Sequence, residues 1–358
     1  MEVDLSVQKK VRHVKNAVVA LMGLSLSLDV LFAAEPVENE GMAGEPTPWS
    51  HLNFQDDPDD FRFAIVPDRT GGDYRGAFTN ALRCADLMHP AFVMTVGDLI
   101  DGFCGKAGYR RQQSELTNFV SRVRAPFFCT VGNHDINVNI PPKAMTCYEE
   151  SNSAWRDYHG SRTYYSFVYK RCLFVVLNTM DGRTDLTVKS GISSAQYDWI
   201  RKTLAENKDA RWTCLFMHHP IEWRSEAWNR LETEVLVPRG RYTVFAGDWH
   251  TYFHVRRRGF DYYILSVAGG VSNMAYHHKE QGDPARKDLY GQEYGEMDHI
   301  VWVTMTANGP EVVNLKLDGI LPGDYLNRAN SKDDTMLTDM DVPPDPKAVQ
   351  RCKELKWR

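Results

Sequence analysis

Five apolar runs of the sequence end in side chains that could bind a metal ion. The side chains at these ends are Asp68, Asp98, Asn133 with His134, His218 with His219, and Asp248 with His250. Taken alone, each motif is more often a polar turn that satisfies its own backbone. Five such motifs together indicate a shared site, because the carboxyl ends of parallel strands meet at one edge of a sheet. Carboxylate, amide and imidazole groups suit divalent and trivalent ions, and this set suffices for two ions about 3.5–4 Å apart.

Short apolar runs alternate with stretches of helical periodicity, and this alternation would bring the five ends together. Strands are expected at 63–66, 92–96, 126–130, 211–216, 242–246, 262–267, 300–306 and 311–317, a hairpin at 164–177, and helices at 78–88, 111–123 and 196–204. Strands that alternate with helices indicate largely parallel pairing. The sequence therefore predicts an α/β fold whose strand ends carry the polar motifs.

The composition is that of a protein with a sizeable core and a modest acidic charge. Of the 358 residues 43% are hydrophobic, and the formal net charge is −5. This charge argues against nucleic acid as the main partner, because binding to a phosphate backbone requires a cationic surface. The densest basic run, at 256–258, is expected to form a solvated turn or a strand edge. The oligomeric state stays open.

The chain is expected to divide into four segments, of which the first is a targeting sequence. Residues 1–34 combine a basic start, about a dozen apolar residues and small residues at the end, as a secretory signal peptide does. The sequence thus predicts export to the periplasm or out of the cell, with no stable membrane anchor after processing. Residues 35–60 are expected to form a linker, 61–318 one folded domain and 319–358 a polar C-terminal tail.

The order and spacing of the motifs resemble those of the calcineurin-like metallophosphoesterases over about 61–305. That family carries D-x-H, G-D-x-x-D, G-N-H-D/E, H and G-H-x-H, each at the end of a strand. The second motif is complete at 97–101 and the third at 132–135, and the fourth matches at His218. Two positions depart from the pattern: Thr70 replaces the histidine of the first motif, and Asp248 replaces the first histidine of the fifth.

The resemblance implies a calcineurin-like metallophosphoesterase fold, in which two mixed β-sheets are sandwiched between helices. It also implies two metal ions, the first bound by Asp68, Asp98 and His250 and the second by Asp98, Asn133, His218 and Asp248. The carboxylate of Asp248 favours manganese, iron or magnesium over zinc at the second site. A site with a single metal ion is the alternative, because Thr70 is a poor ligand.

The implied reaction is hydrolysis of a phosphate monoester or diester on a phosphorylated small molecule, with a metal-bridged hydroxide attacking phosphorus. The resemblance assigns His134 to the leaving-group oxygen, and Asp135 would orient the His134 ring. Arg69 is the first candidate for binding the phosphate oxygens and Arg224 is the second, while His219 would contact the substrate or cap its loop. The alternative is a catalytically weak or inactive relative that binds phosphate ligands or one metal ion, because two family histidines are replaced.

Overall fold

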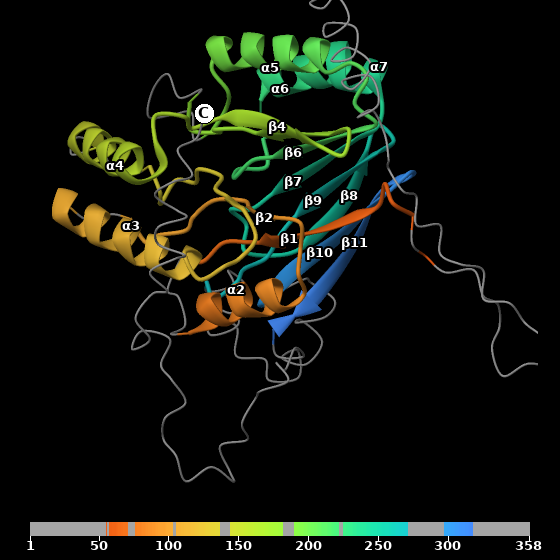
Figure 1. The fold of residues 1–358 in the computed structure, drawn as a ribbon. Helices are drawn as coiled ribbons and strands as arrows, with labels where there is room; N and C mark the ends of the chain where they lie inside the picture. The colour runs from red at the N-terminus through yellow and green to blue at the C-terminus, as the bar shows by residue number, and fades with distance from the viewer. Residues whose placement is uncertain are drawn as a thin grey trace, which may run out of the picture. The chain divides into compact units, whose positions relative to one another are not determined.

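The computed structural model describes residue 55 and the ranges 57–70, 76–102, 105–136, 144–181, 190–221, 225–270 and 297–317. The helices and strands all lie in one compact unit, Asp57–Arg358. They form two mixed β-sheets with helices outside them, the fold that the resemblance implied (Figure 1). The predicted signal peptide at 1–34, most of the predicted linker at 35–60 and the predicted tail at 319–358 lie outside the described residues.

The first sheet has five strands in the order β11-β10-β1-β2-β3. These strands are β1 (Phe61–Val66), β2 (Val93–Thr95), β3 (Phe127–Phe128), β10 (His299–Thr306) and β11 (Gly309–Lys316). The first three pair in parallel, whereas β10 is antiparallel to both β1 and β11. The helices α2 (Ala77–Leu87) and α3 (Lys106–Val120) connect the parallel strands. The carboxyl ends of β1, β2 and β3 therefore lie at the same edge of the sheet.

The second sheet has six strands in the order β4-β5-β6-β7-β9-β8. These strands are β4 (Tyr165–Tyr169), β5 (Cys172–Val176), β6 (Trp212–Phe216), β7 (Tyr242–Ala246), β8 (Phe253–Arg257) and β9 (Phe260–Ile264). The inner four are parallel, and the edge strands β4 and β8 are antiparallel to their neighbours. The helices α5 (Ser194–Glu206) and α6 (Glu226–Leu231), the π-helix η1 (Glu232–Leu236) and α7 (Val237–Arg239) belong to this half of the fold. The helix α4 (Ala144–His159) lies beside α3.

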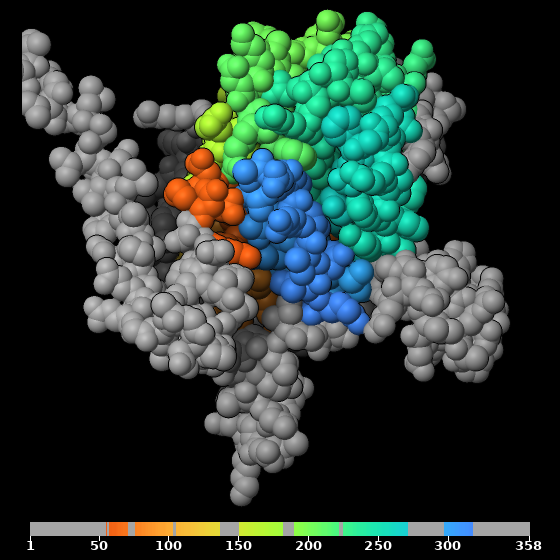
Figure 2. All heavy atoms as spheres, turned by 90° about the vertical axis from the view of Figure 1, so that its right-hand side faces the viewer, coloured from red at the N-terminus to blue at the C-terminus, as the bar shows by residue number. Residues whose placement is uncertain are grey.

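Successive residues of the buried strands face two different hydrophobic layers, because side chains alternate across a strand. In β1, Phe63 and Ile65 pack between the two sheets, where the Phe63 ring meets Phe174 edge-on with centroids 5.5 Å apart. Ala64 and Val66 face the other way and pack against residues of α2 and α3. The helices α5 and α6 cover the outer face of the second sheet (Figure 1). Figure 2 shows the blue β10–β11 hairpin of the first sheet beside the teal strands of the second.

Most of the expected elements are present, with boundaries shifted by a few residues. The hairpin expected at 164–177 is confirmed, and its turn residues Lys170 and Arg171 both have positive φ, 41° and 61°, as a tight two-residue turn requires. The helix expected at 111–123 begins earlier, at Lys106. The helical segment at 226–239 was not expected from the sequence, and Pro238 is accommodated at the start of its last turn, α7.

The basic run at 256–258 lies at a sheet edge, as expected, but two of its arginines pair with a buried carboxylate. The Nε atoms of Arg257 and Arg258 donate to Glu232 in η1 at 2.9 and 2.8 Å, and the Tyr262 hydroxyl donates to the same carboxylate at 2.7 Å. Glu232 is fully buried, so the network joins η1 to the β8–β9 hairpin. Within the described ranges, every helix is too short or too polar to cross a lipid bilayer.

Candidate metal centre

The loops after β1, β2, β3, β6 and β7 carry the predicted ligands, and the structure brings them together around His218. Three oxygen atoms surround His218 Nε2: Asn133 Oδ1 at 3.0 Å, Asp98 Oδ2 at 3.2 Å and Asp248 Oδ1 at 3.8 Å. His218 Nδ1 lies 2.8 Å from the carbonyl oxygen of Val96, so Nδ1–H donates there. This bond fixes the ring and turns Nε2 toward the oxygens, the usual arrangement of a metal-binding imidazole.

Asp68 and His250 form the other part of the cluster. Asp68 Oδ2 lies 3.6 Å from His250 Nε2 and accepts the backbone N–H of Asp248 at 2.9 Å. Asp68 Oδ1 is buried, 4.0 Å from His218 Nδ1, and has no hydrogen-bond partner among the described residues. A buried carboxylate oxygen without a donor is unfavourable, and a bound cation would satisfy it.

Ionisation in the cluster is strongly perturbed, because several carboxylates share a buried volume with imidazoles. Burial raises the pKa of Asp68 well above its ordinary value, and the charges of Asp98 and Asp248 act in the same direction. Burial also acts to raise the pKa of Asp98, but the charge of His218 outweighs it and this pKa lies below its usual range. Burial opposes protonation of His218, yet Asp98 and Asp68 raise its pKa well above its ordinary value. The cluster thus attracts positive charge, and its donor set fits bound metal ions.

Three of the predicted ligands have a left-handed backbone that few residues other than glycine adopt. The φ values are 54° at Asp98, 68° at Asp248 and 53° at His250. Such conformations cost about 1–3 kcal/mol each and cluster at functional sites. The neighbouring Gly132 allows the loops to approach closely, because a Cβ there would overlap Asp98 Oδ1. The backbone is therefore shaped to bring these side chains together at the expense of local strain.

Asp135 makes different contacts from the one that the resemblance implied. Its Oδ2 accepts the backbone N–H groups of Asp98 at 2.8 Å and Gly132 at 2.9 Å, and its Oδ1 accepts the N–H of Leu99 at 2.9 Å. Burial raises the pKa of Asp135 to about 7, and the charge of Asp98 acts in the same direction, against the backbone donors. The expected contact with the His134 ring is thus corrected: Asp135 joins the two loops that carry Asp98 and Asn133.

His134 lies beside a predicted ligand and is partly open to solvent, with 21% of its side chain exposed. Its backbone N–H donates to Asp98 Oδ1 at 2.9 Å, and its Nε2 lies 3.8 Å from Asp98 Oδ2. The ring is positioned by the carbonyl oxygen of Asp101, which lies 2.7 Å from Nδ1. Because a carbonyl oxygen can only accept, this contact places a proton on Nδ1.

Arg69 points into the helical layer, which corrects its expected role in phosphate binding. Side chains alternate in direction along extended chain, so Asp68 and Arg69 face opposite sides. The Arg69 guanidinium lies 5.5 and 5.2 Å from the ring centroids of Phe78 and Phe119, and it donates to Glu115 at 3.1 Å. These contacts hold Arg69 between α2 and α3 as a packing residue.

Thr70 and Arg224 complete the set of residues named from the sequence. Thr70 is buried, and its Oγ1 has no hydrogen-bond partner within the described part of the chain. The position of a family histidine is thus filled by a short, buried hydroxyl side chain. Arg224 lies outside the described residues.

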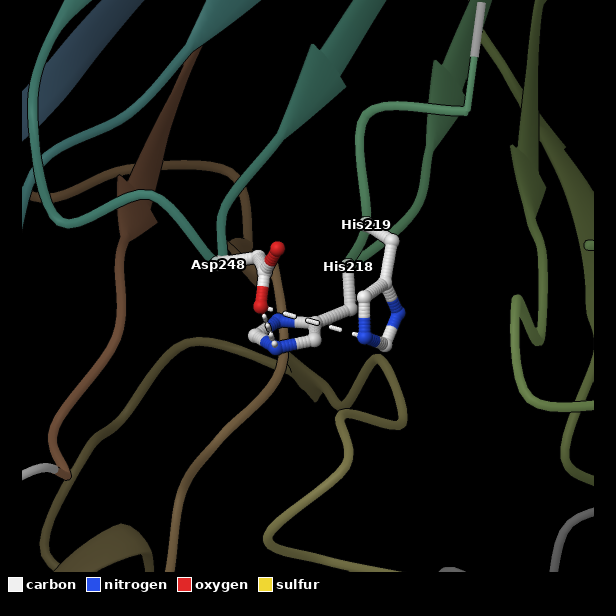
Figure 3. A group of neighbouring side chains, drawn as sticks. All are labelled: His218, His219 and Asp248. Atoms are coloured by element: carbon white, nitrogen blue, oxygen red, sulfur yellow. Dashed lines mark ion pairs between the residues drawn. The ribbon is translucent and has the colours of Figure 1, made fainter. Parts of the chain in front are cut away.

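His219 enters the cluster beside His218, from the same loop after β6, and one oxygen of the Asp248 carboxylate faces both rings (Figure 3). His219 Nε2 lies 3.8 Å from Asp248 Oδ1. Thr179 Oγ1, in the turn after β5, lies 2.8 Å from His219 Nδ1. Thr179 was not among the predicted site residues, because a single threonine after a strand belongs to no motif and gives no signal.

Ser266 and His299 support the loop that carries His250, and neither was among the predicted site residues. The Ser266 hydroxyl donates to the carbonyl oxygen of His250 at 3.0 Å. The backbone N–H of Ser266 donates to His299 Nε2 at 3.1 Å, and His299 Nδ1 lies 3.2 Å from Asn314 Oδ1. His299 belongs to β10, so a strand of the first sheet supports a predicted ligand that follows β7 of the second.

Comparison with known proteins places these features in a family. The sequence profile of the calcineurin-like phosphoesterases matches residues 62–252, more than half of the 358-residue chain. No curated protein sequence matches the chain. Among solved structures, the purple acid phosphatase PPD1 from yellow lupin (Lupinus luteus) seeds is 15% identical, with a TM-score of 0.50 over 72% of this chain and 52% of that one.

Two further solved structures are similar. GAP50, the anchor in the inner membrane complex of Plasmodium, is 14% identical, with a TM-score of 0.49 over 72% of this chain and 85% of that one. A 5′-nucleotidase from Candida albicans is 10% identical, with a TM-score of 0.44 over 82% of this chain and 56% of that one. The likeness to the lupin phosphatase, of which the chain covers about half, supports the fold. The profile match extends from before Asp68 to beyond His250, and the chain therefore belongs to the calcineurin-like phosphoesterase family.

Proposed function

We propose that the protein is a metal-dependent hydrolase of phosphate monoesters or diesters on small molecules. The observation that supports this most strongly is the convergence of Asn133, Asp98 and Asp248 oxygens on His218 Nε2, within 3.0–3.8 Å. Carboxylate, amide and imidazole side chains from the strand ends of both sheets thus meet at one buried site, and their charges attract a cation. The buried, unpartnered oxygen of Asp68 points to the same conclusion.

Two groups of donor atoms would hold two ions. The first group is Asp68, Asp98 and His250, and the second is Asp98, Asn133, His218 and Asp248. When bound, such ions lower the pKa of a water molecule toward neutrality and neutralise the charge of phosphate oxygens. The mixture of oxygen and imidazole donors suits manganese and iron, with zinc and magnesium as further candidates. A centre with a single ion is the alternative to test, because Thr70 stands where the family has a histidine and the first group therefore has only the imidazole of His250.

The chain's own contribution to the leaving group would come from His134. The Asp101 carbonyl holds a proton on Nδ1 and fixes the ring, so Nε2 is the atom that would give a proton to the leaving-group oxygen. General acid catalysis of this kind is worth about 10²–10⁴-fold in rate. Asp135 would act at a distance, by holding the loop of His134 against the loop of Asp98.

Export to the periplasm or the cell exterior is part of the proposal. The basic and apolar composition of residues 1–34, typical of a secretory signal peptide, supports it. The substrate would then be a phosphorylated small molecule outside the cytoplasm.

Hydrolysis of an aryl phosphate and an aryl phosphodiester by the purified protein, with added Mn²⁺ and after chelation, tests this function. Chelation should abolish turnover, and added Mn²⁺ should restore it. The Asn133→Ala variant should lose activity together with a metal ion, whereas His134→Ala should lower kcat about 10²-fold or more at unchanged metal content.

The variant His254→Gln is the matched control, because His254 is an exposed histidine bound to Asp261 at 2.9 Å in the β8–β9 hairpin. It should keep the activity of the wild type. Turnover that survives chelation would contradict the metal-dependent reaction. Metal or phosphate binding without turnover in any metal would instead identify the protein as an inactive relative.

A further inference from the structure

His219 and His218 present their Nε2 atoms to the same carboxylate oxygen. Both nitrogens lie 3.8 Å from Asp248 Oδ1 (Figure 3). The two rings are nearly perpendicular, with an interplanar angle of 83° and centroids 4.8 Å apart. Consecutive residues of a loop thus direct two imidazole edges at one point, opposite a carboxylate from another loop.

The separations of these atoms fit a shared ion. The donor atoms of His218, His219 and Asp248 all lie within 4.8 Å of one another. Donors bound at about 2.1 Å to one ion are roughly 3–3.5 Å apart, so small side-chain adjustments would bring all three into coordination. A direct hydrogen bond does not explain the arrangement, because 3.8 Å exceeds the length of such a bond.

Thr179 sets the direction of the His219 ring. Its hydroxyl oxygen accepts the backbone N–H of His219 at 3.2 Å and lies 2.8 Å from His219 Nδ1. A hydroxyl oxygen has two lone pairs and can accept from both groups. Coordination through Nε2 requires the tautomer with its proton on Nδ1, and Thr179 Oγ1 can accept that proton at 2.8 Å while Nε2 faces Asp248. Thr179 is fully buried, so this contact does not compete with solvent.

We propose that His219 is a further protein ligand of the ion held by Asp98, Asn133, His218 and Asp248. This inference rests on the proposed function, because it concerns the same centre. In the family pattern the position of Asp248 is a histidine, and His219 restores the missing imidazole from a neighbouring loop. Two imidazoles and three oxygen donors suit a borderline ion such as Mn²⁺, Fe²⁺ or Zn²⁺ more than Mg²⁺, which prefers oxygen ligands.

Titration of the metal-free full chain with Mn²⁺, followed by the electron paramagnetic resonance signal of the free ion, tests the assignment. His219→Gln should weaken one binding step by about 100-fold or more. Thr179→Val, which keeps the shape of the side chain but removes the hydroxyl, should weaken the same step by about 10–100-fold. Thr179→Ser keeps the hydroxyl and should bind Mn²⁺ as the wild type does.

Two further measurements make the result specific. Pulsed electron paramagnetic resonance of bound Mn²⁺ should show the nitrogen couplings of one imidazole fewer in His219→Gln than in the wild type. His254→Gln should leave both the affinity and these couplings unchanged. Circular dichroism and thermal unfolding confirm that each variant is folded, and Thr179→Val gives an independent result if His219→Gln does not fold.

The possible failures of the inference and of the proposed function differ. If His219→Gln keeps the Mn²⁺ affinity and couplings but has a raised KM for an aryl phosphate, His219 contacts the substrate and the assignment is overturned while the hydrolase stands. If the wild type binds no Mn²⁺ at all, both the assignment and the metal-dependent hydrolase are overturned.

Discussion

Acidification should destabilise the fold through His299, which is fully buried in β10. Its Nε2 accepts the backbone N–H of Ser266 at 3.1 Å, and its Nδ1 donates to Asn314 Oδ1 at 3.2 Å. The neutral ring satisfies both contacts. A second proton would sit on Nε2 and face the N–H of Ser266, so that two donors would oppose each other. Burial lowers the pKa of His299 to about 4.

The size and sign of the effect follow from this pKa. An exposed histidine in the unfolded chain has a pKa of about 6.5, so the unfolded state binds more protons than the folded state between pH 6.5 and 4. The contribution of His299 to stability is therefore complete above pH 6.5 and is lost as the pH falls toward 4. A difference of about 2.5 pKa units corresponds to about 3 kcal/mol in the free energy of unfolding.

Urea unfolding of the metal-free protein at several pH values between 7.5 and 4.5 measures this loss. The variant His299→Gln keeps an acceptor for the Ser266 N–H but cannot titrate, so it removes the pH-dependent part. The wild type should lose about 2–3 kcal/mol more than the variant over this range. Equal losses in the two proteins would refute the reasoning, because every other titrating group is common to both.

Two structural predictions remain. Glu232→Gln should lower the free energy of unfolding by about 3 kcal/mol in urea, because it removes the buried negative charge that pairs with Arg257 and Arg258 and turns one acceptor into a donor; a loss below about 1 kcal/mol would contradict this. Gly132→Ala should lower the Mn²⁺ content in equilibrium dialysis, because its Cβ would overlap an oxygen of Asp98, whereas Gly105→Ala adds a Cβ in open space and should not. An unchanged Mn²⁺ content in Gly132→Ala would show that the loops can separate without loss of the centre.

The fold and the positions of the predicted ligands could be read from the sequence because both depend on local signals. A buried strand of a parallel sheet is a short apolar run, and the polar motif that follows it lies at the sheet edge by necessity. Asp98, Asn133 and His218 follow such runs directly. The structure places them within hydrogen-bonding distance or close to it, although they are up to 120 residues apart.

What the sequence could not reveal are side-chain directions and partners that come from distant elements. Arg69 adjoins a predicted ligand, yet its side chain alternates toward α2 and α3 and pairs with Glu115. Thr179 belongs to no motif, and its contact with His219 depends on the neighbouring positions of β5 and β6. Both cases depend on three-dimensional packing that no single-sequence pattern encodes.

The three backbone bonds of Asp135 have a mechanical consequence. One carboxylate holds the amides of Asp98, Leu99 and Gly132, so the turns after β2 and β3 cannot drift apart independently. The spacing of Asp98 and Asn133 is then set during folding, before any ion arrives. A cation would then bind to loops that are already held in place, and little binding free energy would be spent on rearranging them. Asp135→Asn should loosen the two turns although it removes none of the predicted ligands.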